Sequence, residues 1–441
     1  MNHLLAGSVF FMLLFCFPLF LSAQERDAPS ADYLEDDWGA DFDVVLVPEN
    51  EPASENVNTN ALSGFWDHAA LKVKGDLAYK DEISIARTQA RFDAAARPFD
   101  NAFFKLDLQY NYYHEKDALV NASDTVQHAL RINDLWLQYT HQACNAKMGR
   151  QKLFWGAVEG SYALDVLMPL DLTEPLLTDF SLIRRSQDMA VFTCFMDGLD
   201  AELFFTPQPL LDQTTIRQHS DIEELEDSLD YEWGGRLTKH FAGLDISLLF
   251  AQVYENTPFA VIDFNTGNLA GLQVDQFNLF GLSMVYAIDR LLLELDVSYQ
   301  QEKKRFAIGA SDTSDTLKYR NELAIGFEYT TDSNHQFSAG AWFFSYLSPL
   351  EPQSKQKSEI WNLNWSKQYL NDDLTLSTLA LWQTQPDNAQ LTLMADYLWD
   401  DQWSSALALG YRALSSGASS SALGLQGEQG WNVQLSVAYQ L

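Results

Sequence analysis

Seven charged residues lie within or beside one long stretch of the chain that lacks a strand-like pattern. Three are basic and four are acidic: Arg150, Arg184, Arg185, Glu159, Asp165, Asp171 and Asp179. Opposed charges across the narrow part of a channel create a transverse field that orients passing polar solutes. The same charges could instead pair as salt bridges that pin the stretch in place. The two interpretations are compatible, so we treat the seven residues as candidates for a constriction.

No catalytic constellation stands out in the sequence. The mature histidines are scattered, and none has the pair spacing of a zinc-binding helix: His68, His114, His128, His141, His219, His240 and His335. A G-x-S-x-G elbow and a phosphate-cradling loop are also absent. We therefore expect no enzymatic activity, no metal site and no cofactor. A Ser/His or Asp/His pair assembled from distant strands keeps a barrel-anchored enzyme open as an alternative, together with an adhesin.

An acidic run occupies residues 221–227. Clustered carboxylates can hold Ca²⁺ or Mg²⁺, and through them bridge to lipid phosphates. The run lacks the spacing of an EF-hand, so a solvated charged surface is the favoured interpretation.

From about residue 66 onward, apolar and polar residues alternate along the chain. Strands with this pattern would position the charged groups. In 104–112 aromatic and Leu residues alternate with Lys, Asp, Gln and Asn, and 291–300 and 322–329 repeat the pattern. Alternation of this kind is typical of strands with one apolar and one polar face. After residue 23 no apolar segment approaches the roughly 18 residues of a membrane helix. Any membrane span must therefore consist of strands.

Connection lengths distinguish a membrane barrel from a soluble sandwich. Short turns are predicted at 197–198, 241–243, 289, 331–334, 371–372 and 400–402. Longer loops alternate with them at 153–187, 207–229, 255–275, 304–317, 347–357 and 414–429. This alternation is typical of short periplasmic turns and long extracellular loops. We predict an all-β fold, a transmembrane antiparallel up-and-down β-barrel of about 18 strands, with 16 as the alternative, because such barrels use even numbers.

The loop 153–187 is the longest of the barrel. It contains Pro169, Pro175 and several leucines that would be poorly solvated outside the barrel. Inward folding into the lumen is therefore the favoured interpretation.

The final strand, residues 431–441, is apolar at every second position and ends with the chain. It resembles the last strand of outer-membrane barrels, which typically end in an aromatic residue with Tyr two positions earlier. Tyr439 matches, whereas Leu441 stands in place of the usual Phe. The resemblance implies recognition by the barrel-assembly machinery, and it places both chain ends in the periplasm.

The N-terminal region fits export from the cytoplasm. Residues 1–23 form an apolar stretch ending in Leu-Ser-Ala, which predicts a cleaved signal peptide, with an uncleaved anchor as the alternative. Residues 24–65 are acidic and predict a periplasmic leader, so the barrel covers 66–441. The net charge of −33 excludes nucleic acid as a partner. The expected partners are outer-membrane lipid and lipopolysaccharide.

Two cysteines are expected to form a disulfide. Cys144 and Cys194 fall near the same rim on neighbouring predicted strands, and the periplasm is oxidising. Such a bond would clamp the base of the hairpin that carries the long loop.

The long loop also carries a motif. The sequence reads G-R-Q at 149–151, W-G at 155–156, L-D-V at 164–166 and P-L-D at 169–171. This pattern resembles an uncharacterised family of proteobacterial outer-membrane barrels, often encoded beside transporters of the resistance-nodulation-division type and a periplasmic partner. More distantly it is similar to porin and alginate-export barrels. Where family members have W-G-E, this chain has Trp155-Gly156-Ala157. The resemblance implies the movement of hydrophobic or lipid-like molecules, and those transporters as partners.

The favoured function is therefore an outer-membrane channel or transport protein for small or hydrophobic, lipid-like solutes, gated by the inward-folded loop 153–187. A general cation-preferring porin is the first alternative, suggested by the acidic surplus and by the lumen-side candidates Asp107, Glu294 and Asp296.

Overall fold

The computed structural model describes residues 66–80, 82–116, 128–172, 184–214, 219–263, 268–306, 316–347, 356–384, 387–414 and 430–441. The expected signal peptide, the expected leader and Asp179 lie outside these ranges.

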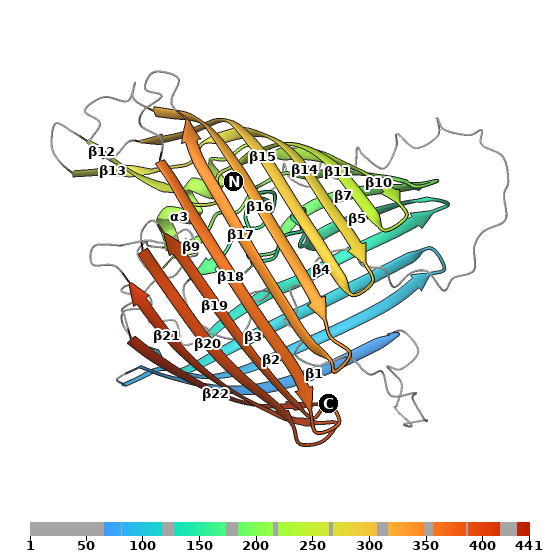
Figure 1. The fold of residues 1–441 in the computed structure, drawn as a ribbon, viewed down its shortest axis with the longest axis vertical. Helices are drawn as coiled ribbons and strands as arrows, with labels where there is room; N and C mark the ends of the chain where they lie inside the picture. The colour runs from blue at the N-terminus through green and yellow to red at the C-terminus, as the bar shows by residue number, and fades with distance from the viewer. Residues whose placement is uncertain are drawn as a thin grey trace, which may run out of the picture. The chain divides into compact units, whose positions relative to one another are not determined.

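Eighteen strands form one closed antiparallel ring (Figure 1). They are β1 (His68–Lys80), β2 (Glu82–Phe99), β3 (Ala102–Lys116), β4 (His128–His141), β5 (Cys144–Gln151), β7 (Gln187–Met196), β8 (Leu199–Thr206), β10 (Glu232–Phe241), β11 (Leu244–Tyr254), β14 (Gln276–Ile288), β15 (Leu291–Phe306), β16 (Thr316–Thr330), β17 (His335–Leu347), β18 (Gln356–Tyr369), β19 (Leu374–Thr384), β20 (Asp387–Leu398), β21 (Trp403–Leu414) and β22 (Gly430–Gln440). Each strand pairs with the next in the ring, which confirms the predicted fold and the predicted strand number.

The last strand closes the ring against the first. In the β1–β22 ladder Val73 pairs with Tyr439, and the backbone N–H of Leu441 donates to the carbonyl of Leu71 over 2.9 Å. Closure leaves no unpaired sheet edge at the chain ends, which is how a barrel avoids edge-to-edge association.

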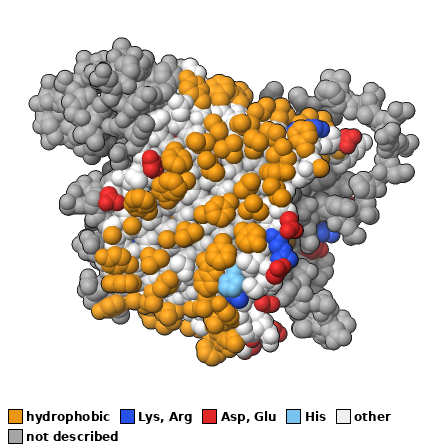
Figure 2. All heavy atoms as spheres, in the orientation of Figure 1, with side chains coloured by type: hydrophobic (Ala, Val, Ile, Leu, Met, Phe, Trp, Pro, Cys, Tyr) orange, Lys and Arg blue, Asp and Glu red, His pale blue; other side chains and the backbone are white. Residues whose placement is uncertain are grey.

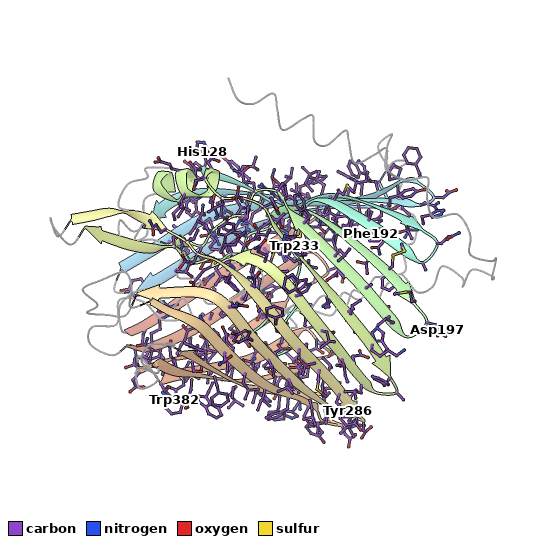
Figure 3. All side chains as sticks on the ribbon, turned by 90° about the horizontal axis from the view of Figure 1, so that it is seen from above. His128, Phe192, Asp197, Trp233, Tyr286 and Trp382 are labelled. Carbon is purple, nitrogen blue, oxygen red and sulfur yellow. A yellow bond between two sulfur atoms is a disulfide. The ribbon has the colours of Figure 1, made fainter. Side chains whose placement is uncertain are left out.

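Short turns gather at one rim, together with the C-terminus. They join strands at residues 100–101, 142–143, 197–198, 242–243, 289–290, 331–334, 370–373 and 399–402. Asp289 and Asn334 adopt positive φ in these turns, as Asp and Asn tolerate better than most residues. Figure 3 shows Asp197 and Tyr286 toward this end and His128 and Trp382 toward the other.

The opposite rim carries the longer connections, but the predicted alternation is not strict. Only residue 81 separates β1 from β2, and only residues 385–386 separate β19 from β20. Neither hairpin was among the predicted connections, because strict alternation leads to the expectation of a long loop at this rim; the connections at 100–101 and 117–127 were not predicted either.

Smaller elements lie in the long connections. A parallel bridge joins β6 (Asp171–Leu172) to β9 (Gln213–Thr214), and β12 (Phe259–Asp263) pairs with β13 (Asn268–Gln273). The acidic run forms part of helix α3 (His219–Asp227). It is not uniformly solvated, since Ile222 and Glu226, one helical turn apart, are both buried.

The strands expose apolar side chains on the outside and polar ones on the inside. On β15, Val297 and Tyr299 are exposed, whereas Asp296 and Gln300 are fully buried. Figure 2 shows hydrophobic side chains spread across the outer face of the strands turned toward the viewer, with charged side chains mostly near its margins. A continuous apolar exterior of this size is expected to face lipid.

Exposed aromatic residues gather near both rims. Toward the short turns they include Tyr139, Tyr286, Tyr329, Tyr369 and Trp403, and toward the opposite rim Trp233, Trp361, Trp382 and Trp431. Two such girdles are characteristic of transmembrane barrels. Within the described residues, no helix is long and apolar enough to cross a membrane.

Candidate functional site in the barrel interior

The described start of the long connection, residues 152–170, lies inside the barrel. Trp155 packs edge-on against Phe204 of β8 at 5.1 Å between ring centroids, and its indole N–H donates to Glu202 over 2.8 Å. Both wall residues point inward, because Leu203 and Phe205 between and beside them are exposed outside. We call residues 152–170 the inner segment.

Two apolar clusters attach the inner segment to the wall. The first joins Trp155, Leu164, Leu167 and Met168 to inward residues of β7, β8, β11 and β14, namely Met189, Val191, Phe204, Leu249, Ala251, Val253, Phe277 and Leu279. The second joins Val158 and Ala163 to Ala324, Trp342, Phe344 and Ile360 of β16, β17 and β18. Burial of this apolar surface supplies the main driving force for inward folding.

Asp296 of β15 anchors the tip of the inner segment. Its Oδ2 accepts the backbone N–H groups of Ala157 and Val158 over 2.9 and 3.0 Å. A fully buried carboxylate requires such donors, because burial without hydrogen bonds is costly. The anchor spans 138 and 139 residues of sequence. No local pattern could have revealed it.

Glu159 continues the attachment to the next strands. Ser338 of β17 donates to Glu159 Oε2 over 2.7 Å, and Asn362 of β18 donates to the Glu159 backbone carbonyl over 2.5 Å. Burial raises the pKa of the Glu159 carboxyl, and the hydrogen bonds from Ser338 and Asn364 partly offset that rise.

Gly160 permits this close approach. Its φ is +70°, and a Cβ atom there would lie 2.5 Å from Asn362 Nδ2. The left-handed backbone favours glycine on steric grounds, and the contact with Asn362 leaves no room for a side chain.

Arg184 and Asp165 form a buried ion pair within the connection. The Arg184 guanidinium also lies over the rings of Phe154 and Tyr162, 5.0 and 5.8 Å from their centroids. Burial raises the pKa of the Asp165 carboxyl, an effect that neighbouring Arg184 opposes. Burial likewise raises the pKa of Tyr162 to about 12.

Two further contacts fix the ends of the connection. Arg185 pairs with Glu226 of α3 over 2.8 Å and also donates to the Leu211 carbonyl. Asp171 pairs with Arg131 of β4 over 2.6 Å. The predicted charges Asp165, Asp171, Arg184 and Arg185 thus all sit in ion pairs, as the pinning interpretation expects.

Arg150 lies apart from the other predicted residues. It forms a two-bond pair with Asp188 of β7, at 3.0 and 2.9 Å. Arg150 shares the outer face of β5 with exposed Met148, two residues earlier. Arg150 therefore does not face Glu159 and Asp165 inside the barrel, as its inclusion among the constriction candidates implied. Residues two apart on a strand share a face, so the apolar Met148 could have indicated that Arg150 points outward.

The inner wall away from the inner segment is polar. On β1–β3 it carries three ion pairs: Arg87–Asp76 at 2.8 Å, Arg91–Asp107 at 2.6 Å and Lys105–Asp93 at 2.8 Å. On β19–β22 its buried polar residues are mostly neutral: Thr375, Ser377, Gln383, Asn388, Gln390, Thr392, Gln434 and Ser436. We call β19–β22 with β1–β3 the polar wall.

Cys144 and Cys194 are joined by a disulfide between β5 and β7, where they are register partners. The bond lies close to the short turns at 142–143 and 197–198, at the base of the hairpin whose loop includes the inner segment.

The described residues hold no group of three or more His, Cys, Asp or Glu side chains arranged to bind a metal ion. Sequence reasoning missed Glu202 and Asp212 as anchors; it placed Asp296 on the lumen side and Glu226 in the acidic run, but it assigned neither of them a contact with the long connection. Asp212 accepts the Leu170 N–H over 2.7 Å and the Thr257 hydroxyl over 2.6 Å.

No known family of proteins matches this sequence, and no curated protein is similar to it. Its fold is similar to several solved barrels. Pseudomonas aeruginosa OpdK, solved with vanillate, is 9% identical with a TM-score of 0.54, covering 86% of this chain and 100% of that one. OccK3 (OpdO) of the same organism is 12% identical with a TM-score of 0.52, covering 88% and 99%. Acinetobacter baumannii OccAB1 is 9% identical with a TM-score of 0.52, covering 85% and 95%. The chain therefore has the fold of these barrels.

Proposed function

We propose that this protein is a channel of the bacterial outer membrane that conducts small polar solutes and is narrowed by the inner segment. The single observation that carries the proposal is the position of that segment, held inside a closed 18-stranded ring by Trp155, Asp296 and Glu159. A loop fixed inside a wide barrel restricts what can pass.

The membrane location rests on the outer face of the ring. Its apolar exterior and its two aromatic girdles are features of barrels that span an outer membrane. OpdK, which shares the fold, is an outer membrane protein.

Polar solutes fit the interior better than the hydrophobic or lipid-like molecules also expected from the sequence. Most of the large inward apolar residues lie in the two clusters that the inner segment covers, whereas Leu379, Leu381 and Met394 lie inward among the polar residues of β19 and β20. The polar wall offers hydrogen-bonding and paired charged groups instead. A solute that passes between the inner segment and the polar wall would replace bound water with hydrogen bonds to that wall.

A general cation-preferring porin fits less well. Asp107, Glu294 and Asp296 do point inward, but Asp107 pairs with Arg91 and Asp296 binds the inner segment. Carboxylates already engaged in this way contribute less to attracting passing cations.

Conductance in planar bilayers tests the proposal. We would compare the wild type with a variant in which residues 156–163 are replaced by a shorter Gly-Ser linker, and with Arg150→Ala as the control on the outer face. We expect a small wild-type conductance, a several-fold increase in the shortened variant and no change in the control. Vanillate, the ligand in the OpdK structure, is a suitable first probe for solute block.

Two results would contradict parts of the proposal. If neither the wild type nor the shortened variant conducts, the protein is not a channel. If both conduct equally, the inner segment is not the constriction. Strong cation selectivity in the wild type would favour the general porin.

A further inference from the structure

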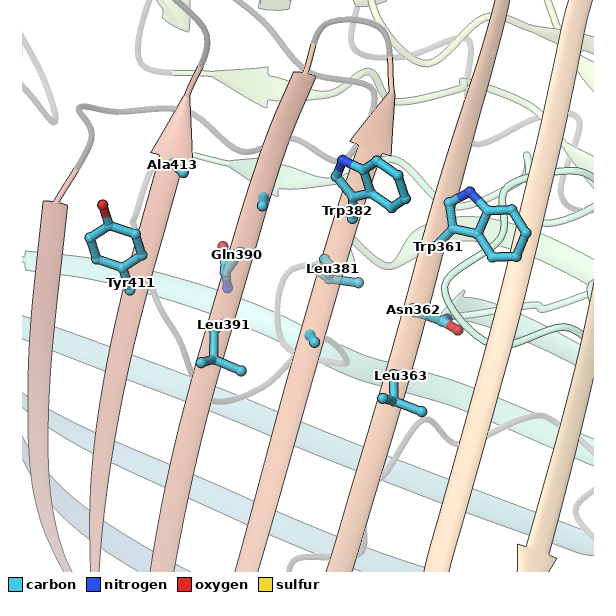
Figure 4. A pocket seen from close by; sticks show the side chains of 11 residues that line it. Trp361, Asn362, Leu363, Leu381, Trp382, Gln390, Leu391, Tyr411 and Ala413 are labelled. Atoms are coloured by element: carbon cyan, nitrogen blue, oxygen red, sulfur yellow. The ribbon is translucent and has the colours of Figure 1, made fainter.

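A hollow of about 600 Å³ lies on the outer face of strands β18–β21 (Figure 4). Its walls are the side chains of Trp361, Leu363, Trp382, Leu391 and Tyr411. Its floor consists of alanines at the positions between them, Ala380, Ala389 and Ala413.

The strand register explains why the surface is hollow there. One row across four strands reads Trp361, Trp382, Ala389, Ala413, and the next reads Leu363, Ala380, Leu391, Tyr411. Neighbouring side chains in such rows touch, so a methyl group beside an indole or phenol leaves a depression.

The polar side chains that border the hollow are engaged on the inner side. Asn362 donates to Glu159 of the inner segment, and Gln390 accepts from Arg412 over 3.0 Å. On the outer side, the Trp382 indole N–H donates to Asp387 over 3.1 Å. What remains for a ligand is hydrocarbon and aromatic surface.

The hollow lies within the aromatic girdle near the rim of long connections. Tyr411 and Trp431 are 4.9 Å apart between ring centroids, and Trp382 is two residues before the end of β19. Because short turns of such barrels face the periplasm and the short turns here lie at the opposite rim, this girdle belongs to the outer leaflet. Girdle residues lie where acyl chains meet head groups, so the depression opens at the start of the hydrocarbon layer.

We propose that this hollow binds one acyl chain of a lipopolysaccharide molecule in the outer leaflet. The inference rests on the outer-membrane location proposed above, but not on conduction. Exposed apolar side chains surround the hollow, among them Leu393 and Leu409, which makes lipid the medium in contact with it. A flexible chain can follow a shallow depression between rings, whereas a second barrel would need a matching apolar ridge.

Filling the hollow tests the inference. Ala389→Leu places a larger side chain on its floor. Ala395→Leu is the matched control, since Ala395 lies on the same face of the same strand, paired with exposed Leu407 and outside the hollow. Both variants and the wild type are reconstituted in vesicles of phosphatidylethanolamine and rough lipopolysaccharide. Lipids retained by each purified barrel are counted by native mass spectrometry.

We expect the wild type and Ala395→Leu to retain one more lipopolysaccharide per barrel than Ala389→Leu. Equal retention in all three proteins would overturn the inference. The inference would also be overturned if Ala389→Leu lost only a phospholipid. It would be overturned as well if Ala389→Leu abolished a dimer, since a second copy of the chain would then occupy the hollow. Conductance of the wild-type barrel is measured separately. A barrel that conducts without this difference refutes only the lipid site, and a silent barrel that shows the difference refutes only the channel.

Discussion

The two halves of the inner wall are built on the same antiparallel ladder but carry different side chains. Strands β7–β18 place Phe204, Leu249, Leu279 and Trp342 inward, and the inner segment covers them. The polar wall places ion pairs and neutral polar groups at the equivalent positions. Alternation therefore decides only which side a residue faces. Whether an inward residue holds the segment or faces the lumen depends on its own chemistry.

If apolar burial holds the inner segment, Trp155→Ala should have the largest effect. Loss of a buried indole costs about 3–5 kcal/mol, so the free energy of unfolding in lipid vesicles should fall by that amount. Trp155→Phe keeps most of the packing and loses the bond to Glu202, at a cost of about 1–2 kcal/mol. Equal losses in the two variants would assign the effect to the hydrogen bond.

Removing a carboxylate should destabilise the protein more on the half of the wall that binds the inner segment than on the polar wall. Asp296→Ala leaves the buried N–H of Val158 and the partly buried N–H of Ala157 without their acceptor and should cost about 3 kcal/mol. Asp93→Ala removes a partly exposed ion pair with Lys105 on the polar wall and should cost less than about 1 kcal/mol. Denaturant unfolding of both variants measures the difference, and similar costs would erase the proposed contrast.

A glycine of the inner segment and a glycine of the polar wall should also differ in how well they tolerate alanine. Gly160→Ala should cost about 1–2 kcal/mol, because the residue has a left-handed backbone and touches Asn362. Gly75→Ala on β1 is the control, since nothing lies within 4 Å of its added Cβ. Protease protection of the inner segment should fall only in Gly160→Ala. Unchanged protection would mean that the tip tolerates displacement from Asn362.

The smallest expected effect is a pH dependence of the inner segment. Burial raises the pKa of Glu159 above its usual value of 4.5, so the folded form binds the proton more tightly than the unfolded form. Its contribution is fully present below 4.5 and is lost as pH rises through the raised pKa. Hydrogen exchange of residues 156–160 should therefore speed up with rising pH beyond its intrinsic dependence. Glu159→Gln should remove that extra dependence, and its persistence would point to another group.

Much of the fold could be predicted because strand faces are local information. The alternation at 291–300 placed Glu294 and Asp296 on the inner side, and the apolar pattern of 431–441 identified the strand that closes the ring. Arg150 shows how the same rule could have been used further. Read with Met148, it belongs to the outer face, where the structure pairs it with Asp188. The two very short hairpins, at residue 81 and at 385–386, escaped prediction because the alternation of connection lengths leads to the expectation of long loops at their rim.

The sequence by itself determined a β-barrel of about 18 strands, the side that each strand residue faces and the region from which an inner segment could come. These follow from two-residue periodicity and from connection length. Only the tertiary structure decided that Asp296 binds the tip of that segment and that Glu202, Ser338 and Asn362 form hydrogen bonds with it. It alone also revealed the three alanines that meet on the outer face. Such contacts join residues from strands far apart in the chain, and they depend on register around a closed ring rather than on any local pattern.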